Sequence, residues 1–210
     1  MMMIEDFGAR VASVWQGLRP STRSLFERAL SASQPPVNPN PAPRGETSYD
    51  ARSEWELSRL LAALDERAAE GGPSALSDEQ TRELARMAET CASVLHNGAR
   101  SAEVFAQLLG RAFRSRDYVR VDALADVMTA RLAPSELCEL ARCPDPSVRA
   151  VAQEALLQLP TAALIGLLGD PVDSDTARYA LEGQADEYGS EEARWIVNAL
   201  DQADEDDEDF

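Results

Sequence analysis

The chain has few side chains of the types that enzymes use for nucleophilic or acid–base chemistry. His96 is its only histidine, and it lies just before Gly98, where we expect a helix to end and where a histidine commonly contacts the last helical carbonyls. The Gly-x-Ser-x-Gly elbow and the dinucleotide fingerprint are absent, and a phosphate-binding loop needs a lysine that the chain lacks. We therefore predict no catalytic residue and no enzymatic activity.

Cysteine and histidine also raise the question of a zinc site. Cys91 with His96, and Cys138 with Cys143, form two pairs whose members are five positions apart. Five positions along a helix rotate a side chain by about 140°, so neither pair converges on one ion if it is helical. We predict that the cysteines are small buried apolar residues, and we expect no metal and no cofactor.

Charge narrows the choice of partner. The 37 acidic and 20 basic residues give a net charge of -17, and every basic residue is an arginine. Residues 150–210 hold 16 acids and two arginines, whereas residues 100–149 hold seven acids and eight arginines. Such acidity argues against general nucleic-acid binding, which depends on neutralising phosphates. It favours a protein partner with a basic surface and a salt-sensitive association.

One segment has the opposite charge. Arg111, Arg114, Arg116 and Arg120 form the only concentrated positive region, and we take them as candidate binding residues. Two interpretations remain open: these arginines complete ion pairs inside the fold, or they bind an acidic partner. A related hypothesis is that the acidic C-terminal tail folds back onto them.

The chain divides into four parts that position these residues. Residues 1–32 form an N-terminal amphipathic helical segment, residues 33–53 a proline-rich linker, residues 54–200 a helical-repeat domain, and residues 201–210 an acidic tail that we expect to be disordered. The N-terminal segment is too short to fold alone. Its docking residues follow helical spacing: Ile4, Phe7, Val11, Val14 and Leu18. It docks either on its own chain or on another subunit.

Helix signals fill the remainder, and no segment alternates as a strand does. Ser53 with Glu56, and Ser77 with Gln80, have the spacing of capping boxes that open two helices. After residue 100 the helices shorten, and prolines or glycines punctuate them about every dozen residues. We therefore predict an all-α fold.

The second half also contains an apparent repeat. Three arginines, each preceded by an aspartate and followed by apolar residues at helical spacing, recur at intervals of 29 positions. The structural residues of this register are Asp117, Arg120, Asp145, Arg149, Asp175 and Arg178.

The segment 145–156, which runs from an aspartate turn through Val148 and Arg149 to alanines and Leu156, resembles the second helix of a HEAT-like repeat of the short, roughly 30-residue class. The resemblance implies an α-solenoid of antiparallel helix pairs, in which these arginines belong to the scaffold. It covers about half the chain, and residues before about 100 show no convincing copy.

Solenoids present extended surfaces to other macromolecules. We therefore expect a non-catalytic protein–protein interaction module: an adaptor, an inhibitor such as an immunity or antitoxin protein, or an assembly subunit. Two alternatives stay open. One is a helical-repeat enzyme similar to the HEAT-like DNA glycosylases or the bilin lyases; the other is a structural homo-oligomer joined by exchange of the N-terminal helices.

Location follows from the same composition. The first ten residues carry Glu5 and Asp6 before any cation, unlike a secretory signal, and the longest apolar run is much too short for a membrane span. Three cysteines fit a reducing compartment. We expect a cytoplasmic protein, and the absence of lysine with only three isoleucines is typical of GC-rich bacterial coding.

Overall fold

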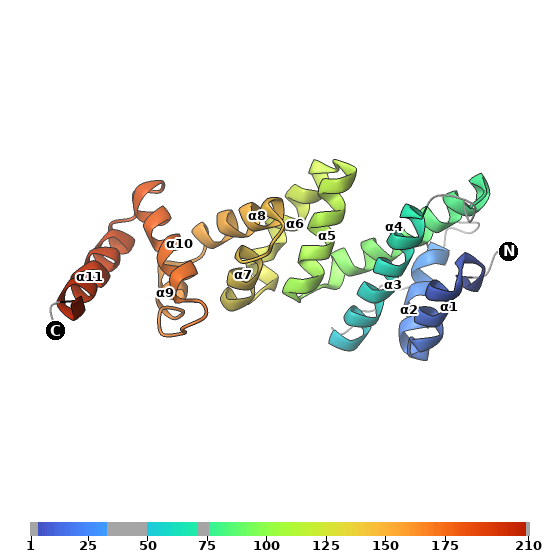
Figure 1. Cartoon of the computed structure of the whole chain (residues 1–210), viewed down its shortest axis with the longest axis horizontal. Helices are drawn as coiled ribbons and strands as arrows, with labels where there is room; N and C mark the ends of the chain where they lie inside the picture. The colour runs from blue at the N-terminus through green and yellow to red at the C-terminus, as the bar shows by residue number, and fades with distance from the viewer. Residues whose placement is uncertain (1–3, 33–49, 71–75, 209–210) are drawn as a thin grey trace. The chain divides into compact units, whose positions relative to one another are not determined.

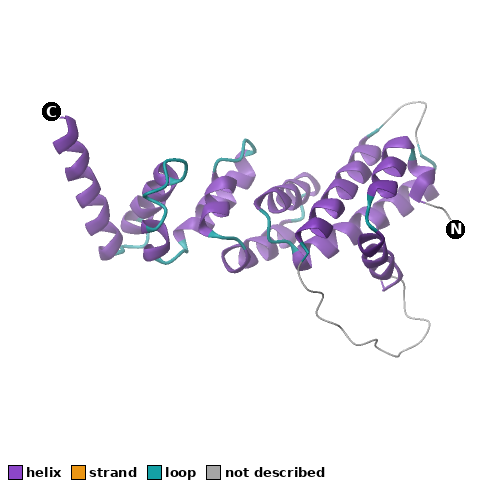
Figure 2. Ribbon diagram, turned by 90° about the horizontal axis from the view of Figure 1, so that it is seen from below, coloured by secondary structure: helices purple, strands orange, loops and turns teal. Residues whose placement is uncertain are grey.

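The computed structural model describes residues 4–32, 50–70 and 76–208. Within these ranges the chain forms a short 3-10 helix, η1 (Ile4–Phe7), and eleven α-helices, with no strand (Figures 1 and 2). The predicted all-α class is confirmed. None of the helices in the described ranges combines the length and the apolar composition that a bilayer crossing requires. The proline-rich stretch of the predicted linker lies outside the described residues.

The chain separates into two compact units, residues 1–99 and residues 100–210. The boundary falls inside the segment that we expected to be one repeat domain, 54–200, at the point where the repeat signal begins.

Unit 1 is built from four α-helices around one core. They are α1 (Ala9–Gly17), α2 (Pro20–Ala32), α3 (Ala51–Ala69) and α4 (Asp78–Gly98). The helix α3 packs along α4, while α1 covers α3 and α2 covers both α3 and α4. Of the predicted docking residues, Ile4, Phe7, Val11 and Leu18 are buried and Val14 is half-buried. The N-terminal segment therefore docks on its own chain in the structure.

The two predicted capping boxes have different outcomes. Ser77 and Gln80 form the reciprocal bonds of a capping box at the start of α4, as predicted. The box at Ser53 and Glu56 is wrong, because α3 begins three residues earlier than predicted and is capped by Asp50, which accepts a bond from the Arg52 N–H. Ser53 and Glu56 lie inside α3 and face the N-terminal segment.

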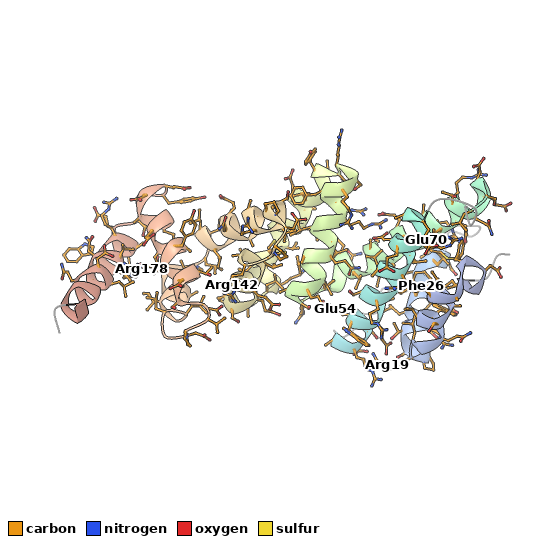
Figure 3. The ribbon with its side chains drawn as sticks, viewed as in Figure 1. Arg19, Phe26, Glu54, Glu70, Arg142 and Arg178 are labelled. Atoms are coloured by element: carbon orange, nitrogen blue, oxygen red, sulfur yellow. The ribbon has the colours of Figure 1, made fainter. Side chains whose placement is uncertain are left out.

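Glu56 ties that segment to α3. Its carboxylate is almost fully buried and accepts hydrogen bonds from the Arg19 backbone N–H at 3.2 Å, from Arg19 Nε at 3.1 Å and from the Thr22 hydroxyl. Arg19 also reaches Asp50 at 2.7 Å (Figure 3). Burial alone raises the pKa of Glu56, but the bonds from Thr22 and Arg19 outweigh it and lower the pKa below its ordinary value.

Unit 2 contains seven α-helices, most of them short. They are α5 (Ala102–Ser115), α6 (Tyr118–Arg131), α7 (Pro134–Ala141), α8 (Pro146–Leu157), α9 (Thr161–Ile165), α10 (Ser174–Asp186) and α11 (Glu191–Glu208). The predicted proline and glycine boundaries separate them, with Pro134 and Pro146 at first helical positions, where the missing N–H costs nothing.

Helix packing in unit 2 follows the order of the chain. The helix α5 packs on α6, α7 on α8, and α10 on both α9 and α11. In addition, α6 packs against α8, and α8 against α10, so these three lie in sequence. The buried side chain of Gln184 in α10 joins α10 to the end of α8, because it donates hydrogen bonds to the backbone carbonyls of Leu157 and Leu159.

The end of unit 2 is the helix α11, which continues to Glu208. The disorder that we expect for residues 201–210 stays a prediction. The first turns of α11 pack on α10, and Asp201 accepts a hydrogen bond from Arg178 of α10. This pairing provides a physical reason for the helix to extend past residue 200.

Candidate binding surface

The predicted arginine cluster spans the turn between α5 and α6. Arg111 and Arg114 lie on α5, Arg116 ends that helix in a left-handed conformation with φ of 56°, and Arg120 lies in the first turn of α6. Burial lowers the pKa of Arg111 below its ordinary value, and the charges of Arg120 and Arg114 lower it further. The structure therefore brings Arg114 and Arg120 each within electrostatic range of Arg111.

Acids of the same unit share this region. Arg120 Nε lies 3.6 Å from Asp117. Arg114 Nη1 and an Asp145 oxygen both border the position that a Gly110 side chain would occupy. The helix α11 packs on α10 instead of on α5 or α6, so the described part of the acidic end does not cover the cluster.

The residues of the predicted register mostly serve the fold. Asp117 caps α6 by accepting from the Arg120 N–H at 3.1 Å, and Asp145 caps α8 by accepting from the Ser147 N–H at 2.9 Å. The residue that precedes α10 is Asp173, whereas Asp175 is exposed within the first turn. The capping positions 117, 145 and 173 are thus 28 residues apart, one fewer than the interval predicted from the arginines.

The three register arginines make different contacts. Arg120 pairs with Asp117, as described, and Arg149 donates to the Cys143 carbonyl at 2.9 Å. Arg178 binds Glu182 at 3.3 Å and Asp201. An arginine outside the register, Arg142, links consecutive helix pairs by donating to buried Asp173 at 2.7 Å (Figure 3).

The strongest candidate for binding lies on α6, α8 and α10. On these helices every exposed charged residue is acidic, while all four of their arginines are half-buried. We define the acidic face as the five exposed acids of these helices together with half-exposed Glu182: Asp122, Asp126, Glu154, Asp175, Glu182 and Asp186. Asp126, Glu154 and Glu182 each lie nine residues after an aspartate at an N-cap position, so this surface has the same 28-residue spacing as those aspartates.

A groove of about 360 Å³ lies within this face, between α8 and α10. Each helix contributes four residues at the i, i+3, i+4 and i+7 positions of a single side. The lining residues are Ala150, Gln153, Glu154 and Leu157 of α8, and Tyr179, Glu182, Gly183 and Asp186 of α10, followed by Glu187. Four of these nine residues carry carboxylates and none is cationic.

Exposed tyrosines accompany the carboxylates. Tyr118 on α6, Tyr179 on α10 and Tyr188 just after α10 are 60%, 59% and 57% exposed. The Tyr188 hydroxyl donates to Glu154 at 2.8 Å, and this bond is the main cause that raises the pKa of Tyr188 above its ordinary value. Aromatic rings beside carboxylates are suited to hold a cationic side chain, by cation–π attraction and by ion pairing.

Unit 1 has a pocket of about 300 Å³ between α2, α3 and α4, lined mainly by apolar residues such as Leu25, Leu57 and Leu95. Asp50 at its edge is already bonded: hydrogen bonds, first from Ser53 and then from Arg19, lower its pKa to about 2. Asp50 and Ser53 of this lining both accept hydrogen bonds from Arg19 and so join α3 to the N-terminal segment.

The cysteines and the histidine considered for a zinc site lie within the described residues. In the described ranges no three histidine, cysteine or acidic side chains converge on a point where an ion would fit. Cys91 and Cys138 are buried, and burial raises the pKa of both thiols, that of Cys138 to about 11. His96 lies in the last turn of α4, at the helix end where we placed it.

Comparison of the chain with protein families, with curated proteins and with solved structures gives no match. The geometry therefore defines the class only as an all-α protein of two helical units.

The acidic face was missed in the sequence because carboxylates are abundant throughout residues 150–210. A detectable signal was the acid nine positions after each of the aspartates at 117, 145 and 173. The register chosen from the arginines placed the third aspartate at 175 and concealed this regularity.

Proposed function

We propose that this protein is a non-catalytic protein–protein interaction module that binds a basic protein through the acidic face of unit 2. The observation that carries the proposal is the sorting of charge on α6, α8 and α10: the acids point outward and the arginines are half-buried in contacts of the fold. A surface with one sign of charge steers a partner of opposite sign and raises the association rate at low salt.

The scaffold in this proposal is a HEAT-like α-solenoid. Its support is the side-by-side packing of α6, α8 and α10, the aspartates at 28-residue intervals, and the Arg142 link to Asp173 between successive helix pairs. Stacked helix pairs of this kind offer one continuous surface to a partner.

The test compares two variants with the same net charge. Asp126→Asn/Glu154→Gln/Glu182→Gln neutralises the 28-residue series of acids. Glu139→Gln/Glu191→Gln/Glu192→Gln neutralises three exposed acids on α7 and α11 of the same unit. Each immobilised protein is incubated with native lysate at low and at high salt, and the retained proteins are identified.

We expect the wild type and the control variant to retain the same basic protein at low salt and to release it at high salt, because screening weakens contacts between exposed charges. The acidic-face variant retains little. Equal retention by the two variants, or retention that does not depend on salt, contradicts the proposal.

A further inference from the structure

The groove between α8 and α10 has a shape and a charge that restrict what it accepts. Its base is formed where Gly183 meets Leu157: a Cβ atom at residue 183 would lie 2.5 Å from Leu157 Cδ2, closer than such atoms approach. Because residue 183 has no side chain, α10 approaches α8 closely at this point of the groove, whose volume is about 360 Å³. A side chain, rather than a flat surface, fills such a space.

The groove is lined by acidic side chains and by no basic one, so we expect its ligand to be a cation. Glu154, Glu182, Asp186 and Glu187 line the groove. Glu182 is partly balanced by Arg178. Within the described residues the carboxylates of Asp186 and Glu187 accept no hydrogen bond and form no ion pair, so they remain available to a ligand.

The arrangement fits an organic cation better than a metal ion. No three acids of the described residues converge as ion ligands do, so the carboxylates act at separate points along the groove. Each helix contributes over seven positions, a length of about 10 Å, which matches a short segment of chain bearing cationic side chains.

The ring of Tyr179 selects among such side chains. Tyr179 is mostly exposed, and Glu182 follows it by three residues on the same side of α10, where side chains are neighbours. A guanidinium group is planar and carries five donors, so it stacks on a ring while donating to an adjacent carboxylate. An ammonium group offers no such plane.

We propose, building on the function proposed above, that this groove is the arginine-binding part of the acidic face. An arginine of the partner lies on the Tyr179 ring and donates to Glu182, and a second cation of the same segment binds Asp186 and Glu187.

The test uses fluorescein-labelled hexapeptides with two arginines, or with two lysines at the same positions, titrated with the full chain at low salt and followed by fluorescence anisotropy. The arginine peptide is expected to bind about three- to tenfold more tightly than the lysine peptide. Tyr179→Ala weakens arginine-peptide binding by about two- to fivefold and removes most of the preference, whereas Tyr179→Phe keeps both because it keeps the ring.

Tyr118→Ala is the matched control, because Tyr118 is equally exposed on α6 but does not line the groove. Equal affinity for the two peptides, or equal effects of Tyr118→Ala and Tyr179→Ala, overturns the arginine site and leaves the basic-partner function standing. If neither peptide binds at low salt, both proposals fail.

Discussion

The buried carboxylate of Glu56 is expected to hold the N-terminal segment on unit 1, and its neutralisation tests this directly. Glu56→Gln preserves size and one acceptor oxygen but removes the charge. Hydrogen bonds to a charged group contribute about 1.5–3 kcal/mol, against about 1 kcal/mol for neutral pairs. Glu56 is 4% exposed and accepts from both Arg19 and Thr22. Arg19 keeps Asp50 as a second partner, which limits the loss. We expect unit 1 to lose about 2–3 kcal/mol of its free energy of unfolding.

Glu66→Gln is the matched control. Glu66 also lies on α3 and also binds an arginine of the N-terminal segment, Arg10, at 2.6 Å, but the two side chains are 49% and 69% exposed. Exposed ion pairs contribute between zero and about 1 kcal/mol, so this variant should unfold almost as the wild type does.

The assay is urea unfolding followed by tryptophan fluorescence in a Trp195→Phe background, where the remaining tryptophans, Trp15 and Trp55, both belong to unit 1. Equal losses in the Glu56 and Glu66 variants, or no loss in Glu56→Gln, would refute the assignment of the docking energy to this buried carboxylate.

The stability difference between wild type and Glu56→Gln is expected to depend on pH. Because the folded-state pKa of Glu56 lies below its ordinary value of 4.5, its contribution is fully present above that value and is lost as the pH falls through the folded pKa. The stability difference between wild type and Glu56→Gln should therefore shrink below about pH 4.5. A difference that stays constant down to pH 3 contradicts this linkage.

Two further substitutions and one labelling experiment follow. Arg116→Gly should raise the free energy of unfolding of unit 2 by about 0.5–1 kcal/mol, because Arg116 adopts a left-handed φ of 56° that glycine accepts without strain. Arg114→Gly, within the last turn of α5, should lower it by up to about 1 kcal/mol; denaturant unfolding measures both, and the same sign for the two variants counts against the strain argument. With a thiol reagent near pH 8, half-buried Cys143 should react first and buried Cys91 last, because burial raises the pKa of the Cys91 thiol. Mass spectrometry of time points gives the order, and early labelling of Cys91 contradicts it.

A sequence motif predicts a hydrogen bond correctly when both partners lie within the motif. Ser77 and Gln80 bond each other across one helical turn, and the sequence is sufficient to predict them. Ser53 and Glu56 have the same spacing, but their side chains bond Arg19 and Thr22, more than thirty residues earlier. The spacing of the motif does not indicate such long-range partners. Because Ser53 and Glu56 bond these partners, Asp50 caps the helix instead.

The repeat register shows a second limit. Buried positions recur at 29 residues from α8 to α10, as at Val148 and Ala177, whereas the aspartates at the N-cap positions recur at 28. The arginines of the sequence register share the 29-residue interval of the buried positions, so they do not reveal the 28-residue interval of the N-cap aspartates. The acidic face depends on which side of each helix is covered, and composition alone does not contain that information.

Residues 1–99 and residues 100–210 each enclose a buried core of their own, so we expect the two units to unfold in separable steps. Heat or urea can melt one unit while the other stays folded, so a single midpoint would average two events. The three tryptophans separate these events, since Trp15 and Trp55 report on the first unit and Trp195 on the second. The acidic face and its groove belong to residues 100–210, so under the proposed function a chain whose first unit has unfolded is expected to keep its binding to a basic partner.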